Sequence, residues 1–391
     1  MAINDLDVIQ ASTILEAAIS QAQGGTALTS LSTGGFTTLA TTALKTGLDK
    51  LSTGLSQVLS KTIFAVRPYN RKFQILENDA ITYGNHVRKV SYIDEALEDT
   101  PAYGLTDSYS VDQQVVKKPK ALQVNFYGYN TFNYHQTVYR KQLEMALRGP
   151  EEWAAWLGGL MQHIQNKMEK AHEESARMTI NNLISAQYYM RSNTSCVVHL
   201  LTEYNAWAGE NLDATTVFNP ANFKAFAEWF YGRLATLSRM LTERSELYHL
   251  NLTGYKVERH TPVEDQRLIM LAQNMDQVAS NVLANVFNDG YLRTIPREEI
   301  NYWQSIQSPA SINTSCGYTK LDGTTGTASV SLSGIVFGVL FDKDAAGYTT
   351  VDTDYNVAPY NVPGKYWNHF WSFQDRYYND TTENCVVMLL D

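Results

Sequence analysis

The feature that most constrains this chain is a long stretch of helical periodicity that follows the sequence GPEEW at residues 149–153. Apolar side chains recur there in steps of three and four, at Trp153, Trp156, Leu157, Leu160, Met161, Ile164, Met168, Ala171 and Met178. Pro150 suits a first helical turn, and Glu151 and Glu152 favour the positive end of a helix dipole. The pattern predicts one helix that continues to about Tyr189, with roughly 40 residues and a length of about 60 Å. An element of that length spans a whole subunit.

A second constraint is the aromatic segment KYWNHFWSFQDRYYND at residues 365–380. As a strand it places one set of side chains on a single face, namely Trp367, His369, Trp371, Phe373, Asp375 and Tyr377. We expect this face to form a sheet core packed under the long helix. The sequence NDTTEN then predicts a turn, and CVVMLL predicts a last strand paired with its aromatic neighbour. An exposed carbohydrate-binding platform is the alternative for this aromatic face.

Residues 84–134 are typical of long β structure with a polar excursion between two strands. The excursion carries an acidic block followed by a basic one: Asp94, Glu95, Glu98 and Asp99, then Lys117, Lys118 and Lys120. One interpretation is a solvated hairpin tip. The other is a protruding arm whose two charge blocks meet complementary charges on adjacent copies of the chain.

Residues 1–62 differ in composition from the rest and indicate an arm rather than a domain. Its second half has helical apolar spacing, which includes Leu44, Leu48, Leu51 and Leu55. Few basic residues and no aromatic anchor after Phe36 make membrane binding the weaker interpretation, and docking on protein is expected. Two Gly-Gly pairs, at 24–25 and 34–35, divide the arm into hinged pieces.

Residues 191–334 indicate a mixed α/β lobe inserted after the long helix. A helix is predicted at about 220–244, a strand at 267–272, a further helix over MDQVASNVLANVF, a Gly/Ser/Thr-rich excursion and a buried strand IVFGVLF. The lobe contains no nucleotide-binding glycine motif, nucleophile elbow, zinc-protease motif or CxxC pair. Glu169 and His172 have the spacing of a di-iron ligand pair, but no second copy occurs, and a surface ion pair is expected.

Composition narrows the function classes. The net charge of −9 and the pI near 5.4 argue against direct binding along a nucleic acid backbone. Three scattered cysteines predict free buried thiols rather than a disulfide framework or a metal motif. The sequence shows neither a signal peptide nor an apolar run long enough to span a bilayer, so no export signal and no membrane partner are expected.

The order of these parts carries a resemblance to a known family. The chain resembles the Hong Kong 97-type major capsid proteins of tailed bacteriophages, with a flexible arm, a long hairpin, a spine helix, an inserted lobe and a C-terminal sheet. The ending from FDKDAAGYTT onward is similar to the close of many such proteins, with a DKDA turn, an aromatic strand, an ND..EN turn and an apolar last strand. The arm GGTALTSLSTGGFTTLATTALKTGLDKLSTGLSQVLS is similar to their arms.

The resemblance implies an α+β fold with an N-terminal arm, an extended β-hairpin loop, a long spine helix, a peripheral sheet and an inserted α/β axial domain. The implied division is an arm (1–62), a first peripheral part (63–86), the hairpin loop (87–130), the peripheral segment with the spine helix (131–190), the axial domain (191–334) and peripheral C-terminal strands (335–391). The charged residues of the hairpin and the leucines of the arm become expected contacts between subunits.

The implied function is self-assembly into the icosahedral head shell that encloses the double-stranded DNA of a tailed phage, without catalysis or a cofactor. The implied partners are copies of the chain in pentamers and hexamers, with scaffolding, portal and decoration proteins as further candidates. Assembly is expected in the bacterial host cytoplasm. Two alternatives stay open: a surface carbohydrate-binding or membrane-active protein, and an enzyme with an unrecognised site in residues 191–334.

Overall fold

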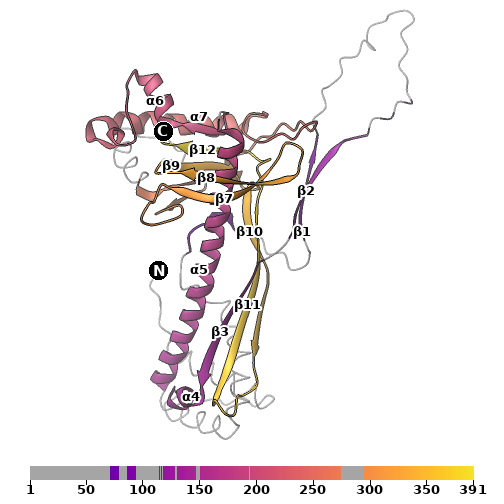
Figure 1. Cartoon of the computed structure of the whole chain (residues 1–391), viewed down its shortest axis with the longest axis vertical. Helices are drawn as coiled ribbons and strands as arrows, with labels where there is room; N and C mark the ends of the chain where they lie inside the picture. Colours follow the sequence, from indigo (N-terminus) through magenta and orange to yellow (C-terminus); the bar gives the residue numbers. More distant parts are fainter. Residues whose placement is uncertain are drawn as a thin grey trace, which may run out of the picture.

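The computed structural model describes residues 71–78, 86–93, 114, 116, 118–127, 130–146, 150–192, 194–273 and 295–391. One long helix organises this part of the chain (Figure 1). A three-stranded sheet runs beside the first part of the helix, and a five-stranded sheet with its own helices lies at the other end. The architecture is the expected α+β arrangement.

The long helix is α5, Pro150–Arg191, and it confirms the predicted spine. The short helix α4, Arg140–Ala146, precedes it. In its second half α5 buries Ile180, Leu183 and Ile184 completely, in a core shared with the five-stranded sheet. The helix is therefore stabilised by apolar packing along one face, which the steps of three and four predict.

The three-stranded sheet has the order β10-β11-β3 and is antiparallel throughout. Its strands are β3 (Asn130–Tyr139), β10 (Ala346–Val357) and β11 (Tyr366–Asn379). Trp367, Trp371 and Phe373 of β11 are buried, while Phe370 on the opposite face is exposed. The aromatic segment therefore forms a sheet core beside α5, as predicted.

The predicted surface ion pair between Glu169 and His172 is wrong. The His172 Nδ1 atom lies 2.8 Å from Asp375 Oδ2, and both side chains are buried between α5 and β11. Glu169 instead accepts a hydrogen bond of 3.1 Å from Arg71 Nη1. Helical spacing predicts that the two residues share a surface, but a charged side chain at the edge of a core pairs with whatever the tertiary fold brings to it.

The five-stranded sheet has the order β4-β12-β9-β5-β6. Its strands are β4 (Val197–His199), β5 (Gln266–Leu271), β6 (Arg297–Ile300), β9 (Val336–Asp342) and β12 (Cys385–Leu389). Helices α6 (Leu200–Ala208) and α7 (Pro220–Thr242) cover one face, and α5 with the β7–β8 hairpin covers the other. Side chains of β12 alternate between these two cores, with Val387 on the α5 side and Val386 and Met388 on the α7 side.

The predicted pairing of the last strand with the aromatic strand is wrong. The strand β12 pairs with β9 on one side and with β4 on the other, and so belongs to the five-stranded sheet. The turn after β11 carries the chain from one sheet to the other instead of closing a hairpin. A run of apolar residues without alternation suits a strand covered on both faces, which the three-stranded sheet could not provide for it.

The remaining elements complete the described chain. They are the short 3-10 helices η1 (Gln74–Leu76), η3 (Thr216–Phe218) and η4 (Val263–Asp265), the ribbon of β1 (His86–Tyr92) with β2 (Ala121–Tyr127), and the hairpin of β7 (Ile312–Thr319) with β8 (Thr325–Leu332). The Gly/Ser/Thr-rich excursion is thus a regular antiparallel hairpin packed on α5. The helix predicted over MDQVASNVLANVF lies outside the described residues.

Gly338 gives the first testable prediction, because it sits in the middle of β9 between Met270 of β5 and Met388 of β12. A Cβ atom there would lie 2.8 Å from Met270 Cγ and 3.0 Å from the backbone oxygen of Ile269. We expect Gly338→Ala to lower the free energy of unfolding by about 1–3 kcal/mol through overpacking. Gly317→Ala in β7 is the control, since its Cβ would meet nothing within 4 Å. Equal urea midpoints for the two variants would contradict the prediction.

Candidate functional site

Most of the residues predicted to contact other subunits lie outside the described residues. These are Leu44, Leu48, Leu51 and Leu55 of the arm, and Asp94, Glu95, Glu98, Asp99 and Lys117 of the hairpin. Lys118 and Lys120 are described, and both are exposed just before β2. The backbone of Lys120 accepts a hydrogen bond from the amide of Ile93, so it continues the β1–β2 pairing. The contact role of all these residues stays a prediction.

The β1–β2 ribbon itself presents a candidate contact surface. It lies at the side of the molecule, away from α5 (Figure 1). Tyr92 and Tyr127 on its outer face are 69% and 71% exposed, and Val90 between them is 48% exposed. Their register partners on the same face are short or polar, such as Gln123 opposite Val90. Tyr92 and Tyr127 lie at opposite ends of this face, and exposed aromatic side chains of this kind are enriched where another protein binds.

The inner face of the ribbon is fastened to the body by a charge cluster, which we define as Lys89, Arg259, Asp380 and Glu383. The Lys89 ammonium lies 2.7 Å from Asp380 Oδ2 and also pairs with Glu383. Arg259 pairs with Glu383 as well, and its second nitrogen donates to Ser91 Oγ at 3.2 Å. Lys89 of the ribbon is therefore held directly by two buried carboxylates of the turn that follows β11, and Ser91 is held through Arg259, which pairs with one of them.

That turn, residues 380–384, is the DTTEN part of the NDTTEN segment at 379–384, and each residue from Asp380 to Asn384 is buried. The Asp380 carboxylate accepts hydrogen bonds from the backbone amide and the hydroxyl of Thr382, at 2.9 and 2.7 Å. The Thr381 carbonyl accepts from the Leu250 amide and from Gln187 on α5. The turn therefore connects the spine helix, the ribbon and the loop around Leu250.

The turn also contacts the DKDA segment, Asp342–Ala345. The Asp380 amide donates to the Ala345 carbonyl at 2.7 Å, and the Asp342 amide donates to the Asn384 carbonyl at 2.9 Å. Thr261 links their side chains, because it donates to Asp342 Oδ2 and accepts from Asn384. The two motifs that stood out at the end of the sequence thus form one hydrogen-bonded unit, although a whole hairpin separates them in the chain.

The two carboxyls of the charge cluster differ in proton affinity. Burial alone would raise the pKa of Asp380, but Lys89 and the hydrogen bonds from Thr382 lower it below the usual value. For Glu383 burial outweighs the attraction of Lys89 and Arg259, and the pKa of this carboxyl is raised. Asp380 is therefore the firm anion of the cluster, and Glu383 is the first to take up a proton as pH falls.

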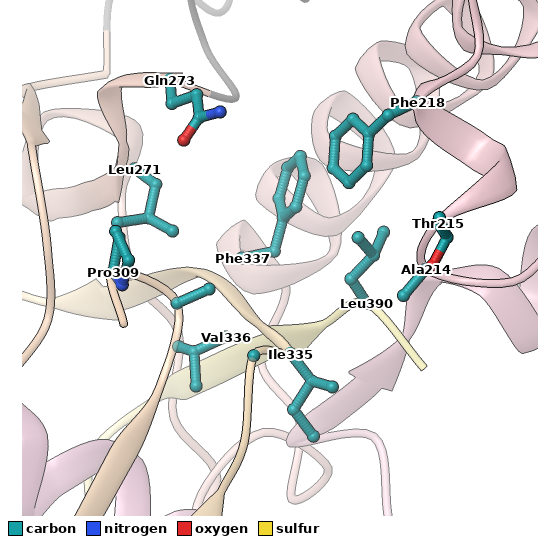
Figure 2. A pocket seen from close by; sticks show the side chains of 12 residues that line it. Ala214, Thr215, Phe218, Leu271, Gln273, Pro309, Ile335, Val336, Phe337 and Leu390 are labelled. Atoms are coloured by element: carbon teal, nitrogen blue, oxygen red, sulfur yellow. The ribbon is translucent and has the colours of Figure 1, made fainter. Parts of the chain in front are cut away.

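An enzymatic alternative would need a reactive pocket in residues 191–334, and an apolar cavity that these residues line for the most part does not provide one. It has a volume of about 470 Å³ and lies at the edge of the five-stranded sheet. Figure 2 shows apolar side chains from several elements, among them Phe218, Phe337 and Leu390, facing a shared space. The polar side chains of its wall are Thr215 and Gln273, and no acid, base or thiol lines it. This cavity offers no proton transfer or metal ligation.

Metal and membrane chemistry gain no support from the described residues. Among them, no group of three or more histidine, cysteine or acidic side chains is arranged to hold a metal ion. Cys196, Cys316 and Cys385 are free and buried, as predicted. Of the helices in the described part of the chain, none is both long and apolar enough to cross a bilayer.

Comparison with known proteins identifies the family. The model of the Phi29-like phage major capsid protein family matches residues 13–389. A search of curated proteins found no match. Two solved structures show the same fold. One comes from the capsid of Staphylococcus phage Andhra, with a TM-score of 0.50, 9% identity, and coverage of 82% of this chain and 84% of that chain.

The other comes from a structure of the head fiber and inner core protein gp22 of native bacteriophage P68, with a TM-score of 0.51, 8% identity, and coverage of 82% of this chain and 85% of that chain. At such low identities these structures show the fold alone, and the family model shows the family to which the chain belongs. The fold expected from the Hong Kong 97 resemblance is confirmed. The chain belongs to the Phi29-like phage major capsid protein family and is a subunit of a phage head shell.

Proposed function

We propose that this subunit builds its shell as pentamers and hexamers, held together by the N-terminal arm and by the extended hairpin. The observation that carries this proposal is the β1–β2 ribbon, which exposes Tyr92 and Tyr127 on one face while Lys89 fastens the other. A ribbon held firmly at its base can present the same contact surface in every copy. Many such contacts, each weak, add up in a closed assembly.

In this proposal the charges of the hairpin determine how the ribbon is oriented against neighbouring copies. The acidic block at 94–99 and the basic block at 117–120 would meet opposite charges on neighbouring copies. The net charge of −9 supports a shell that encloses DNA without binding it by sequence. Catalysis and a cofactor have no part in the proposal, and assembly takes place in the host cytoplasm. Scaffolding, portal and decoration proteins are the further partners it allows.

We also propose a revised division of the chain. The strands β9 and β12 lie within the C-terminal segment 335–391, yet they pair with β5 and β4 of the inserted lobe. Residues 336–342 and 385–389 would therefore move with the axial domain, whereas β10 and β11 would stay with the spine helix. In this division the chain passes from the axial part to the peripheral part after β9 and returns to the axial part before β12.

The arm provides the test. We expect the purified full chain to form closed shells, tubes or rings, and we expect deletion of residues 1–62 to lower their yield by at least tenfold, because many repeated contacts are lost together. Negative-stain electron microscopy and sedimentation measure the yield. The control replaces Leu44, Leu48, Leu51 and Leu55 with serine, which keeps the length of the arm and removes its apolar face.

A truncated chain that assembles as well as the full chain would exclude the arm as a contact between copies. A full chain that stays monomeric at high concentration, and that assembles once scaffold is added, would show that the contacts need a partner to form. Assembly by the truncated chain but not by the serine variant would also contradict the proposal, because deletion must be the more severe change.

A further inference from the structure

A short segment after the arm, residues 71–78, braces the molecule from within; we call it the strap. Arg71 donates to Glu169 of α5 at 3.1 Å and lies over the Tyr348 ring of β10, 5.2 Å from its centroid. The Lys72 ammonium donates to the Glu299 carbonyl of β6 at 2.9 Å. Asn78 donates to the Tyr378 hydroxyl of β11 at 2.7 Å. The strap therefore contacts the spine helix and both larger sheets.

The strap holds an unfavourable backbone conformation at Phe73. Its φ of 66° and ψ of 28° lie in the left-handed region, which is unfavourable for a residue with a side chain. Phe73 is completely buried, and the Arg177 guanidinium lies 5.0 Å from the centroid of its ring. Such a conformation persists only where surrounding contacts impose it.

Glu298 supplies the contact that imposes it. One carboxylate oxygen accepts a hydrogen bond from the Phe73 amide, and the other accepts from the Ile75 amide at 3.3 Å. Burial raises the pKa of the Glu298 carboxyl above its usual value, and the two amides and Lys72 only partly oppose that shift. The other polar contacts of the strap lie towards its two ends, at Arg71, Lys72, Glu77 and Asn78, whereas Glu298 holds the amides of Phe73 and Ile75.

We propose that Glu298 is a positioning residue that locks the strap and so fixes the point at which the N-terminal arm leaves the subunit. A fixed exit point matters because the arm must start from the same place in every copy to reach the same site on a neighbour. The lock couples that exit point to β6 of the five-stranded sheet and to α5. The consequence for assembly rests on the proposed role of the arm, whereas the lock itself does not.

The lock is tested first on the unassembled full chain, by amide hydrogen exchange at Phe73 and Ile75. We expect Glu298→Ala to speed exchange of both amides roughly tenfold or more, because each loses its hydrogen-bond acceptor. Glu298→Gln keeps one acceptor oxygen and should give a smaller increase. The matched control is Glu299→Ala on the same strand, whose carboxylate makes a single, long 3.9 Å ion pair with Arg297 among the described residues. It should leave strap exchange unchanged.

Global stability separates positioning from a general loss of structure. The urea midpoint of Glu298→Gln should stay close to that of the control, while its strap amides exchange faster. Unchanged exchange at Phe73 and Ile75 in both Glu298 variants would overturn the proposal. So would faster exchange spread equally over β5 and β9, which would mean that the carboxylate supports the sheet and not the strap.

Assembly yield then tests the consequence. Faster strap exchange together with a lower yield of closed shells, in the direction of the deletion of residues 1–62, would support the positioning role. Faster exchange with a normal yield would overturn that role, provided that the arm deletion itself lowers the yield at least tenfold. If the deletion has no effect, the proposed function of the arm fails, and the exchange data still decide whether the lock exists.

Discussion

Asp380→Ala is expected to destabilise the subunit by about 3–5 kcal/mol, the usual cost of removing one partner of a buried ion pair. Asp380 is 3% exposed and lies 2.7 Å from the Lys89 ammonium, whose side chain is itself 18% exposed. After the substitution Lys89 still pairs with Glu383, but Glu383 is shared with Arg259. The substitution removes the acceptor for the amide and the hydroxyl of Thr382 as well. Urea unfolding followed by fluorescence measures the loss.

The control for this prediction is Asp265→Ala. Asp265 and Lys343 form an ion pair of 2.8 Å, almost the same length, but their side chains are 31% and 43% exposed. An exposed pair of this kind contributes less than about 1 kcal/mol. The comparison therefore separates burial from distance. Similar losses for the two variants would contradict the view that the buried charge cluster fastens the turn.

The position of the ribbon should change together with stability. Lys89 is the ribbon residue that Asp380 holds, so β1 should exchange its amides faster in Asp380→Ala than in Asp265→Ala.

Low pH should also lower the free energy of unfolding. The lowered pKa of Asp380 means that its contribution to stability is present above the usual aspartate pKa and is lost as pH falls through the lower, folded value. The more readily protonated Glu383, with its raised pKa, makes no such contribution.

The parts of the fold that the sequence predicts are those with local periodicity. The steps of three and four after Pro150 predict α5 almost to its last residue, and the alternation after Tyr366 predicts the buried face of β11. Hydrophobic periodicity reports which face is buried, because it depends only on neighbours along one element. It does not report which element covers that face.

The parts that could not be predicted are contacts between distant segments. Lys89, Arg259 and Asp380 come from three separate regions, and no local spacing links them. Helical spacing predicts that Glu169 pairs with His172, but in the structure Glu169 pairs with Arg71 and His172 pairs with Asp375. One feature of the sequence could have predicted the sheet to which the last strand belongs. A run such as Cys385–Leu389, without polar alternation, favours a strand buried on both faces, and the neighbouring aromatic strand alternates.

Trp303 carries the second large prediction, because it fills the contact between α5 and the five-stranded sheet. Its ring is completely buried, and its Nε1–H donates to the Val336 carbonyl at 3.2 Å. Its own carbonyl accepts from Asn181 of α5 at 3.0 Å, so the residue touches both elements. We expect Trp303→Ala to cost about 3–5 kcal/mol, from the cavity it leaves and from the loss of the indole donor to the Val336 carbonyl.

Two further variants separate these causes. Trp303→Phe keeps most of the apolar volume and loses the N–H donor, so it should cost about 1–3 kcal/mol. Trp207→Ala removes a ring of the same size from α6, where it is 68% exposed, and should change stability by less than about 1 kcal/mol. A ranking with Trp207→Ala equal to Trp303→Ala would mean that the helix and the sheet are not held together at Trp303. The expected ranking would show that packing around Trp303 holds α5 rigidly against the five-stranded sheet. A subunit needs such rigidity when many identical copies must close one shell.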